Sequence, residues 1–452
     1  MNISIVGTGY VGLVTGVCLA QKGHEVICVD KKPDVIKKIN NMICPIYEPK
    51  LPEMLEEVVK KKRLIATSDL EFAVNNSDVT IVAVGTPFNS GAIDLSYIET
   101  CVKEIGSILE DKEAYHVVCI KSTVVPSTTD GVVKKLLEET SQKKAGCFGL
   151  AMNPEFLREG CAVDDFMNPD RIVIGAYDDK SYETMSKIYK DCFETPILKV
   201  NLRTAEMIKY TSNSLLATMI SFANEVSNIC ESIGSIDAID VFNGLILDKR
   251  ISIRNKSKVL LPGLVQYLKP GCGFGGSCFP KDVKALVTHS IQNNYNPEML
   301  EAVLKINEIQ PTIMIKKLEE LIGDVKDKKI AVLGIAFKAD TDDIRESPAL
   351  KIIRELLEKG SVVYATDPQA IANTKKELRG IEGLKLVKNY REALCDADAV
   401  LLVTAWDIYK KIKPKDFIKL MKRAVVVDGR RIYDKKEMEK LDIVYSGIGI
   451  NN

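Results

Sequence analysis

The first thirty residues contain the feature that most limits what this chain can fold into. The apolar run "NISIVG" is followed by the glycine-rich "TGYVGLVTGVCLAQKG" and then by a second apolar run, "HEVICVD". This succession predicts a strand, a tight turn, a helix and a second strand parallel to the first. Both strands are apolar throughout, which is typical of a parallel sheet covered by helices on both faces. We therefore expect the chain to begin with a doubly wound α/β sheet.

The predicted turn has the spacing G-x-G-x-x-G, formed by Gly7, Gly9 and Gly12, and Asp30 ends the second strand. In such a frame the first glycine permits the turn, the second lets a pyrophosphate approach the backbone, and the third allows close packing of the helix on the strand. Asp30 would accept hydrogen bonds from ribose hydroxyls and repel a 2′-phosphate, although Lys31 follows it directly. An ordinary tight turn is the alternative, but the frame and the acid favour an NAD-binding site.

The remainder of the chain divides by pattern into three parts. More buried strands are predicted at "DVTIVAVGTP", "YHVVCIKST", "GLAMNP" and "RIVIGA". From Arg203 to Gly234 apolar residues recur at helical spacing without a proline, which predicts one long helix. We expect an all-helical middle section up to about residue 320, interrupted by the loop "LKPGCGFGGSCFP".

The last third again alternates strands and helices. Strands are predicted at "KKIAVLGIAF", "SVVYATDP" and "DADAVLLVTAW", with "RAVVVDGRR" as the last of them. The fold class is therefore α/β, with two Rossmann-like doubly wound domains joined by a central helical domain with one long helix. The expected domains are 1–200, 201–320 and 321–452.

Composition removes several classes of protein. The 62 basic residues balance 62 acidic ones without long blocks of either sign, which argues against nucleic-acid binding. No stretch reaches the roughly 18 apolar residues of a membrane helix, and the strand-like start does not resemble a signal peptide. We expect a cytoplasmic protein that does not bind membranes. Twelve cysteines without a CxxC pair, and three histidines, predict neither disulfides nor a metal site.

The loop "GCGFGGSCFPKD" places a thiol in a glycine-rich frame. Cys278 stands just before Phe279 and Pro280, and proline favours the first turn of a helix. A cysteine at a helix N-terminus near Lys281 meets the conditions that stabilise a thiolate, and the glycines would let a substrate come close. Cys272 lies in the same loop, so a disulfide, a structural thiol or a metal pair are the alternatives to a nucleophilic Cys278.

Six motifs in order resemble a known family. "GTGYVG", "NPEFLREG", "EMIKYTSN", "GGSCFPKD", "GIAFKADTDDIRESP" and "DGRR", spread over nearly the whole chain, are similar to the UDP-glucose 6-dehydrogenase family of nucleotide-sugar dehydrogenases. Ser277 and Lys281 favour the glucose branch over UDP-N-acetylmannosamine-type enzymes. The GDP-mannose branch shares "GGSC" and "PKD" and remains the alternative. The resemblance implies oxidation of a primary alcohol to a carboxylate with two NAD and one water, in which Cys278 captures the aldehyde as a thiohemiacetal and then forms a thioester.

The resemblance also implies roles for individual residues. Lys209 would stabilise the alkoxide and the later oxyanions, and Asn213, four residues on, could share that oxygen. Asp282 would orient or activate water, with Thr123 and Glu155 in the same network. Without the resemblance, Lys209 would be interpreted as a lysine on the solvated face of a helix. The implied cofactor contacts, beyond the glycines and Asp30, are Tyr10, Val11, Thr86, Thr123, Lys281 and Arg345. The implied substrate contacts are Glu155, Phe156, Leu157, Glu159, Lys209, Asn213, Arg250, Phe274, Gly275, Lys338 and Arg430.

Some of these assignments have open alternatives. Thr86 and Thr123 follow predicted strands at the ligand-binding edge of the sheet, but either could be a helix cap. Arg250 lies 28 residues before Cys278, a longer separation than the family pattern, so Arg254 could take its place. The resemblance implies a homodimer or a larger homo-oligomer, with the long helix as the expected contact. A non-enzymatic NAD-binding scaffold would have lost catalytic residues, whereas all of them are present here.

Overall fold

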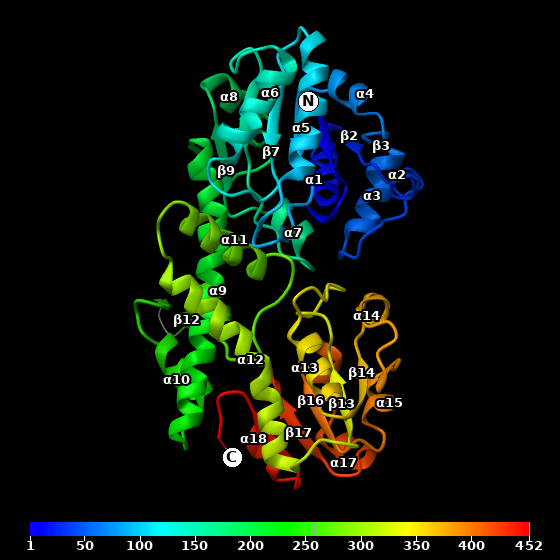
Figure 1. Ribbon diagram of the computed structural model, residues 1–452, viewed down its shortest axis with the longest axis vertical. Helices are drawn as coiled ribbons and strands as arrows, with labels where there is room; N and C mark the ends of the chain where they lie inside the picture. Colours follow the sequence, from blue (N-terminus) through cyan, green and yellow to red (C-terminus); the bar gives the residue numbers. More distant parts are fainter. Residues whose placement is uncertain (256–257, 452) are drawn as a thin grey trace. The chain divides into compact units, whose positions relative to one another are not determined.

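The computed structural model describes residues 1–255 and 258–451, in which two compact units, Met1–Ser212 and Asn213–Asn452, are distinguished by their contacts. Figure 1 labels their helices and strands. The second unit contains both the helical middle section and the C-terminal sheet. The division into three domains at residues 200 and 320 stays a prediction.

The first unit is built on an eight-stranded sheet. From one edge to the other the strands are β10 (Ile197–Val200), β9 (Ile172–Ala176), β8 (Gly149–Met152), β7 (Val117–Ile120), β4 (Val79–Val82), β1 (Asn2–Val6), β2 (Glu25–Val29) and β3 (Leu64–Thr67). Neighbouring strands are parallel except β8 and β9, which are antiparallel. The sequence did not predict β3 or β10, nor the short pair β5 (Phe88–Asn89) and β6 (Ala92–Ile93).

Helices cover both faces of this sheet, which confirms the doubly wound prediction. Alternate residues of β1 belong to different apolar clusters, with Ile3 and Ile5 in one and Val6 in the other. A strand buried on both faces needs apolar residues throughout, because successive side chains point to opposite sides. The helices are α1 (Tyr10–Gln21), α2 (Pro33–Asn40), α3 (Leu51–Lys60), α4 (Leu70–Asn75), α5 (Ser96–Asp111), the π-helix η1 (Thr128–Val133), α6 (Lys134–Ser141), α7 (Ala162–Met167) and α8 (Asp179–Lys190).

The middle section contains the predicted long helix. Helix α9 (Leu202–Ile233), green in Figure 1, ends at Gly234, whose φ of +81° is the left-handed conformation that commonly terminates helices. It is followed by α10 (Ala238–Ile246), η2 (Gly263–Tyr267), α11 (Phe279–Gln292) and α12 (Glu298–Ile322). The all-helical prediction is wrong at one place, because β11 (Ile253–Asn255) and β12 (Lys258–Leu260) pair as an antiparallel hairpin. No helix of the described residues is both long and apolar enough to cross a bilayer.

The C-terminal sheet has six parallel strands. Their order is β15 (Leu384–Leu386), β14 (Val362–Thr366), β13 (Lys329–Leu333), β16 (Ala399–Leu402), β17 (Val425–Asp428) and β18 (Val444–Gly447). β17 was predicted to be the last strand, but β18 follows it, and β15 was also missed. The helices are α13 (Pro348–Glu358), α14 (Ile371–Glu377), α15 (Tyr390–Leu394), α16 (Asp407–Lys410), α17 (Pro414–Leu420) and α18 (Lys435–Glu439).

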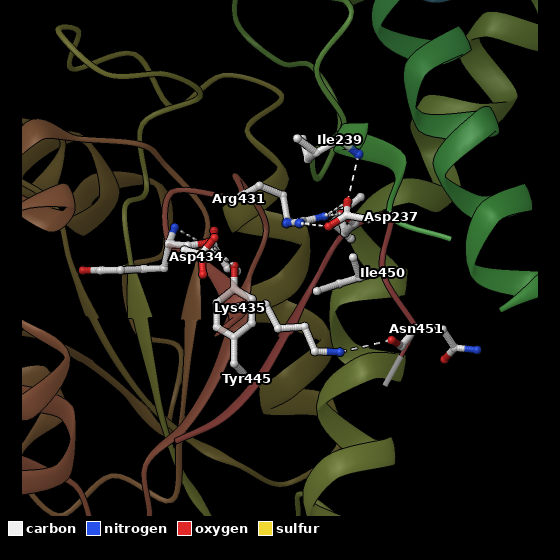
Figure 2. A network of polar contacts seen from close by, with 12 residues as sticks. Asp237, Ile239, Arg431, Asp434, Lys435, Tyr445, Ile450 and Asn451 are labelled. Atoms are coloured by element: carbon white, nitrogen blue, oxygen red, sulfur yellow. Dashed lines mark hydrogen bonds and ion pairs between the residues drawn. The ribbon is translucent and has the colours of Figure 1, made fainter. Parts of the chain in front are cut away.

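The end of the chain is bound to the helical section of the same unit. Arg431 donates to both carboxylate oxygens of Asp237, at 3.0 and 2.7 Å (Figure 2). The N–H of Gly449 donates to Glu231 at 2.5 Å, and the buried Lys317 bonds both Glu231 and the carbonyl of Ile450. Residues 447–451 are therefore an integral part of the second unit.

Candidate functional site

The glycine turn after β1 has the geometry that a dinucleotide site requires. Gly7 has a φ of +94°, and a Cβ there would lie 2.9 Å from the carbonyl oxygen of Ala83. A Cβ on Gly12 would lie 1.8 Å from the Gly7 carbonyl oxygen, whereas one on Gly9 would meet nothing within 4 Å. The fold thus needs glycine at the first and third positions, and the second leaves open space before the N-terminus of α1. A pyrophosphate fits this arrangement.

Asp30 is held at the end of β2 by the same turn. Its Oδ2 accepts hydrogen bonds from the Thr8 N–H at 3.0 Å and the Thr8 hydroxyl at 2.5 Å, and its Oδ1 accepts the Lys32 N–H. Burial works to raise the pKa of Asp30, but these hydrogen bonds outweigh it and hold the pKa below its usual value. The half-buried carboxylate is therefore ionised at neutral pH and can accept from a ribose. Lys31 is paired with Glu104 at 3.1 Å.

A buried ion pair lies elsewhere in the first unit. Lys209 Nζ is 2.8 Å from Glu155 Oε1, and Oε2 accepts the N–H of Leu157 at 2.6 Å. The Lys209 side chain is only 4% exposed, so the solvated-face interpretation of this lysine is wrong. Burial tends to raise the pKa of Glu155, but the adjacent ammonium lowers it below the usual value, and the carboxylate is charged. The ring of Phe156 lies 5.7 Å from the ammonium.

A second buried ammonium lies close by and was missed from the sequence. Lys121 Nζ donates to Asn153 Oδ1 at 2.9 Å, and Tyr189 donates to the same oxygen at 2.6 Å. Burial lowers the pKa of Lys121 to about 8, while the charge of Glu155 acts to raise it. The available signal was its position, because Lys121 directly follows the apolar run of β7 and precedes Ser122 and Thr123 in "KST".

The threonines at the carboxyl edge of the first sheet contact each other's segments. Thr86 donates its hydroxyl to the carbonyl of Thr123 at 2.9 Å, so this bond joins the loops after β4 and β7. Tyr10, the first residue of α1, donates its hydroxyl to Glu48. Val11 follows it in the first turn of α1, and Glu159 is half-buried in the segment after β8.

In the second unit, Cys278 is the N-cap residue of α11, as the proline pattern predicted. Its Sγ lies 3.5 Å from the Ser277 hydroxyl. One turn into the helix, the buried Asp282 accepts from the Asn213 amide at 2.6 Å and from Lys281 Nζ at 2.5 Å. Asn213, Lys281 and Asp282 thus form one network beside the N-terminus that carries the thiol.

The glycines of the thiol loop are required by packing. A Cβ on Gly275 would lie 2.4 Å from the Glu346 carbonyl oxygen, and one on Gly276 would lie 2.8 Å from the Phe337 ring. The Gly276 N–H also donates to the carbonyl of Arg345 at 2.8 Å. Phe337 and Glu346 therefore leave no room for a Cβ at either position, which gives both glycines a packing role. That the glycines also let a substrate come close stays a prediction.

Cys272 in the same loop is a structural thiol. It is fully buried, its Sγ contacts the Val403 carbonyl, and burial raises the pKa of its thiol. All twelve cysteines are free, and no cluster that could hold a metal ion occurs within residues 1–255 and 258–451.

The other predicted ligand contacts of the second unit include substrate residues and the predicted cofactor contact Arg345. Arg430 is half-buried and donates to the Val403 carbonyl at 2.7 Å, and its Nη1 lies 3.0 Å from where a Cβ on Gly271 would be. Lys338 is half-buried beside Phe337. Arg345 is exposed and binds Asp343 bidentately, and Arg250 is exposed and binds Asp248. Phe274 is buried among apolar side chains. The side chain of Arg254 lies outside the described part of the chain.

Three models of one family match successive parts of this chain. The NAD binding domain of the UDP-glucose/GDP-mannose dehydrogenase family matches residues 1–193, its central domain residues 203–309 and its UDP binding domain residues 331–435. The chain belongs to this family.

Similar proteins share its full length. A UDP-glucose 6-dehydrogenase of Haloferax volcanii is 40% identical, covering 97% of this chain and 98% of its own. One from Bacillus subtilis is 39% identical, covering 99% and 93%. A solved UDP-glucose dehydrogenase from Pyrobaculum islandicum is 37% identical with a TM-score of 0.89, covering 99% of this chain and 97% of that one. The family's NAD binding domain coincides with the glycine turn and Asp30, as the sequence predicted.

Proposed function

We propose that this chain oxidises UDP-glucose to UDP-glucuronate, in a reaction that consumes two NAD and one water and yields two NADH and three protons. The observation that carries the proposal is the thiol of Cys278 at the N-cap of α11, one turn before the buried Asp282. Support comes from membership of the family and from the full-length relatives, whose names state this substrate. NAD, when bound, would accept one hydride in each of the two oxidations.

The chain's own residues divide the remaining chemistry. Cys278 adds to the C6 aldehyde and forms a thiohemiacetal, which becomes a thioester at the second oxidation. Covalent capture keeps the aldehyde from escaping between the two steps. Asp282 then orients the water that cleaves the thioester, which regenerates the thiol and leaves a carboxylate. Asp282 is held for this role by Asn213 and Lys281.

Lys209 stabilises the oxygen that becomes negatively charged. An ammonium at 4% exposure acts in a medium of low dielectric, where its attraction for an oxyanion is much stronger than in water. Glu155 keeps Lys209 charged and fixed, and Thr123 belongs to the same proposed network. Phe156, Leu157 and Glu159 would contact the nucleotide sugar.

The remaining residues carried over from the family bind the two ligands. Tyr10 and Val11 would contact NAD through the N–H groups of the first turn of α1. Thr86, Lys281 and Arg345 would also contact NAD. Arg250, Phe274, Gly275, Lys338 and Arg430 would contact the UDP-sugar. Arginine forks suit phosphate oxygens.

The number of NADH formed per UDP-glucose consumed, with limiting sugar and excess NAD, tests the proposal. We expect two. Cys278→Ser should lower turnover by at least about a thousandfold, as is common for a lost nucleophile. Cys395→Ser is a matched control, because Cys395 is an exposed thiol after α15. A ratio of one would make the enzyme a simple alcohol dehydrogenase. Reaction only with GDP-mannose or a UDP-N-acetylhexosamine would change the substrate and keep the chemistry.

We also propose that the chain forms a homodimer through α9. Leu215, Phe222, Ile229 and Ile233 are each about half exposed or more and recur at spacings of seven, seven and four residues. Such a stripe on a helix is typical of a helix that packs against another one, and a two-fold dimer would cover it with the same stripe of a second copy. Phe222→Glu should halve the mass measured by light scattering. Phe72→Glu, at another exposed phenylalanine on α4, should leave it unchanged.

A further inference from the structure

One buried carboxylate in the first unit is not used by the proposed chemistry. Glu48 lies in the loop between α2 and α3 and is 2% exposed. Its Oε1 accepts the N–H of Ala162 at 2.7 Å, and its Oε2 accepts the N–H of Gly160 at 2.7 Å. Oε2 also accepts the hydroxyl of Tyr10, and that hydroxyl in turn accepts the Gly160 N–H at 3.1 Å. Glu48 therefore joins three segments that are far apart in the sequence.

Two of these segments carry predicted ligand contacts. Tyr10 is the first residue of α1 and follows Gly9, the open position of the glycine turn. Gly160 and Ala162 close the segment after β8, which contains Glu155 and the proposed sugar contacts. The hydrogen bonds of Glu48 therefore connect the glycine turn with the segment of residues 153–162, which contains the proposed sugar contacts and is called the sugar segment below.

The other end of the sugar segment is fixed independently. Asn153 accepts from Lys121 and Tyr189 and donates to the Val173 carbonyl at 2.8 Å. These partners lie in or beside the sheet, so this end does not depend on the cofactor turn. A change at Tyr10 would therefore act on the Gly160 end of the segment.

The hydroxyl of Tyr10, which donates the hydrogen bond to Glu48, keeps its proton across the working pH range. Burial and the neighbouring Glu48 carboxylate raise the pKa of Tyr10 well above its usual value. The hydroxyl consequently remains a donor to Glu48, and a hydrogen bond to a charged acceptor is among the stronger ones that a protein makes.

We propose that Tyr10 and Glu48 are positioning residues that couple occupancy of the glycine turn to the order of residues 155–162. An anion bound by the N–H groups of the first turn of α1 restrains Tyr10, and its hydroxyl passes this restraint through Glu48 to Gly160 and Ala162. The coupling is reciprocal, because a ligand that orders one site must favour the other by the same factor. The inference rests on the proposed cofactor position at the glycine turn.

Hydrogen exchange of the full-length chain, measured by mass spectrometry with and without NADH, tests the coupling. In the wild type, NADH should slow exchange both in a peptide covering residues 7–14 and in one covering 157–166. Tyr10→Phe removes only the hydroxyl, so the first peptide should remain protected and the second should lose its NADH-dependent protection. Tyr182→Phe on α8 is the matched control and should behave as the wild type.

Calorimetric titration of UDP-glucose gives a second readout. We expect saturating NADH to tighten sugar binding at least about fivefold in the wild type, within the usual range of such couplings, and to have no effect in Tyr10→Phe. Glu48→Gln should weaken sugar binding with and without NADH, because an amide oxygen cannot replace both carboxylate oxygens as acceptors.

The outcomes separate the two proposals. Protection of residues 157–166 by NADH in Tyr10→Phe, equal to that in the wild type, would overturn the link while leaving the cofactor turn in place. Absence of protection at residues 7–14 in the wild type, with NADH still bound, would overturn the position assigned to the cofactor and the link with it.

Discussion

The two parallel sheets begin alike and then diverge. β1 is followed by Gly7 with a φ of +94°, and β13 by Gly334 with a φ of +95°. In each case the N–H of this glycine donates to the last residue of the next strand, and an aspartate, Asp30 or Asp367, comes directly after that strand. The same local solution of strand, tight turn and acid therefore occurs twice in one chain.

The surroundings of the two aspartates differ. Asp30 is half-buried and accepts from Thr8 and Lys32. Asp367 is 3% exposed, and its Oδ2 alone accepts from the N–H groups of Ile335 and Ala336 and from the indole of Trp406. The Asp30 carboxylate can still accept a hydrogen bond from a ligand, whereas the Asp367 carboxylate is occupied by hydrogen bonds that hold its own turn.

The helices that follow differ as well. α1 begins four residues after β1, so its N–H groups stand beside the turn. α13 begins only at Pro348, after a connector of residues 334–347 that includes Lys338 and Arg345. One turn thus presents a helix N-terminus to a ligand, and the other presents side chains on a long loop. An acid after the second strand indicates a ribose site only when the helix N-terminus and solvent access come with it.

The largest effect should come from the glycines. Gly334→Ala places a Cβ 2.4 Å from Thr404 Cβ at a positive φ, and we expect it to destabilise the second unit by about 3 kcal/mol. Urea unfolding followed by the fluorescence of Trp406, the one tryptophan, measures this. Gly9→Ala should keep wild-type stability and weaken NAD binding about tenfold through lost backbone contacts. Equal loss of stability in both variants would erase the distinction between the turns.

Substitutions of the two aspartates should distinguish the two turns in the same way, with smaller effects on stability and binding. Asp367→Asn leaves buried N–H donors with poorer acceptors, and we expect a loss of about 2 kcal/mol in the free energy of unfolding. Asp30→Asn should change stability little, weaken NAD binding and narrow the preference for NAD over NADP. Titration of both cofactors against each variant, together with urea unfolding, checks this. Reduced NAD affinity in Asp367→Asn without loss of stability would contradict the assignment.

Acid should affect the first sheet more than the second. His116 directly precedes β7 of the first sheet and is buried beside Thr80 and Lys112. Residues 321–452, which contain the second sheet, include no histidine. Burial lowers the pKa of His116 to about 3, with the Lys112 charge acting in the same direction. Because the folded pKa lies below the unfolded one, the unfolded state binds the proton first, and stability falls as the pH drops below about 6.5.

The expected loss between pH 6.5 and 5 is up to about 2 kcal/mol. Urea unfolding at several pH values, followed by far-UV circular dichroism, measures the slope. His116→Gln should be less stable than the wild type at neutral pH, and its free energy of unfolding should depend less on pH. His289→Gln, on α11 of the second unit, is the comparison variant. A slope that His116→Gln leaves unchanged would assign the acid sensitivity to other groups.

The sequence was informative where a short stretch determines its own structure. The turn at Gly7, the length of α9 and the position of Cys278 at a helix start all follow from local patterns. β3 and β18 were missed because their runs are short and partly polar, and their pairing depends on distant strands.

The polar network of the first unit could be predicted only in part. The resemblance named Glu155 and Lys209 as site residues but grouped Glu155 with Thr123 and Asp282, so the ion pair between Glu155 and Lys209 was not predicted. The partners of Lys121 and Glu48 could not be predicted, because each residue acquires them only when segments distant along the chain are brought together. Gly275 and Gly276 of the thiol loop show the same limit, since their packing partners Glu346 and Phe337 lie far along the chain.

The binding of residues 447–451 to the helical section has a consequence for how the protein is made. The contact between Gly449 and Glu231 spans 218 residues, and that between Arg431 and Asp237 spans 194. During synthesis, the end of α9 and the start of α10 are complete long before their partners leave the ribosome. The polar groups of Glu231 and Asp237 therefore acquire these partners only late in synthesis, once residues 431–449 have left the ribosome.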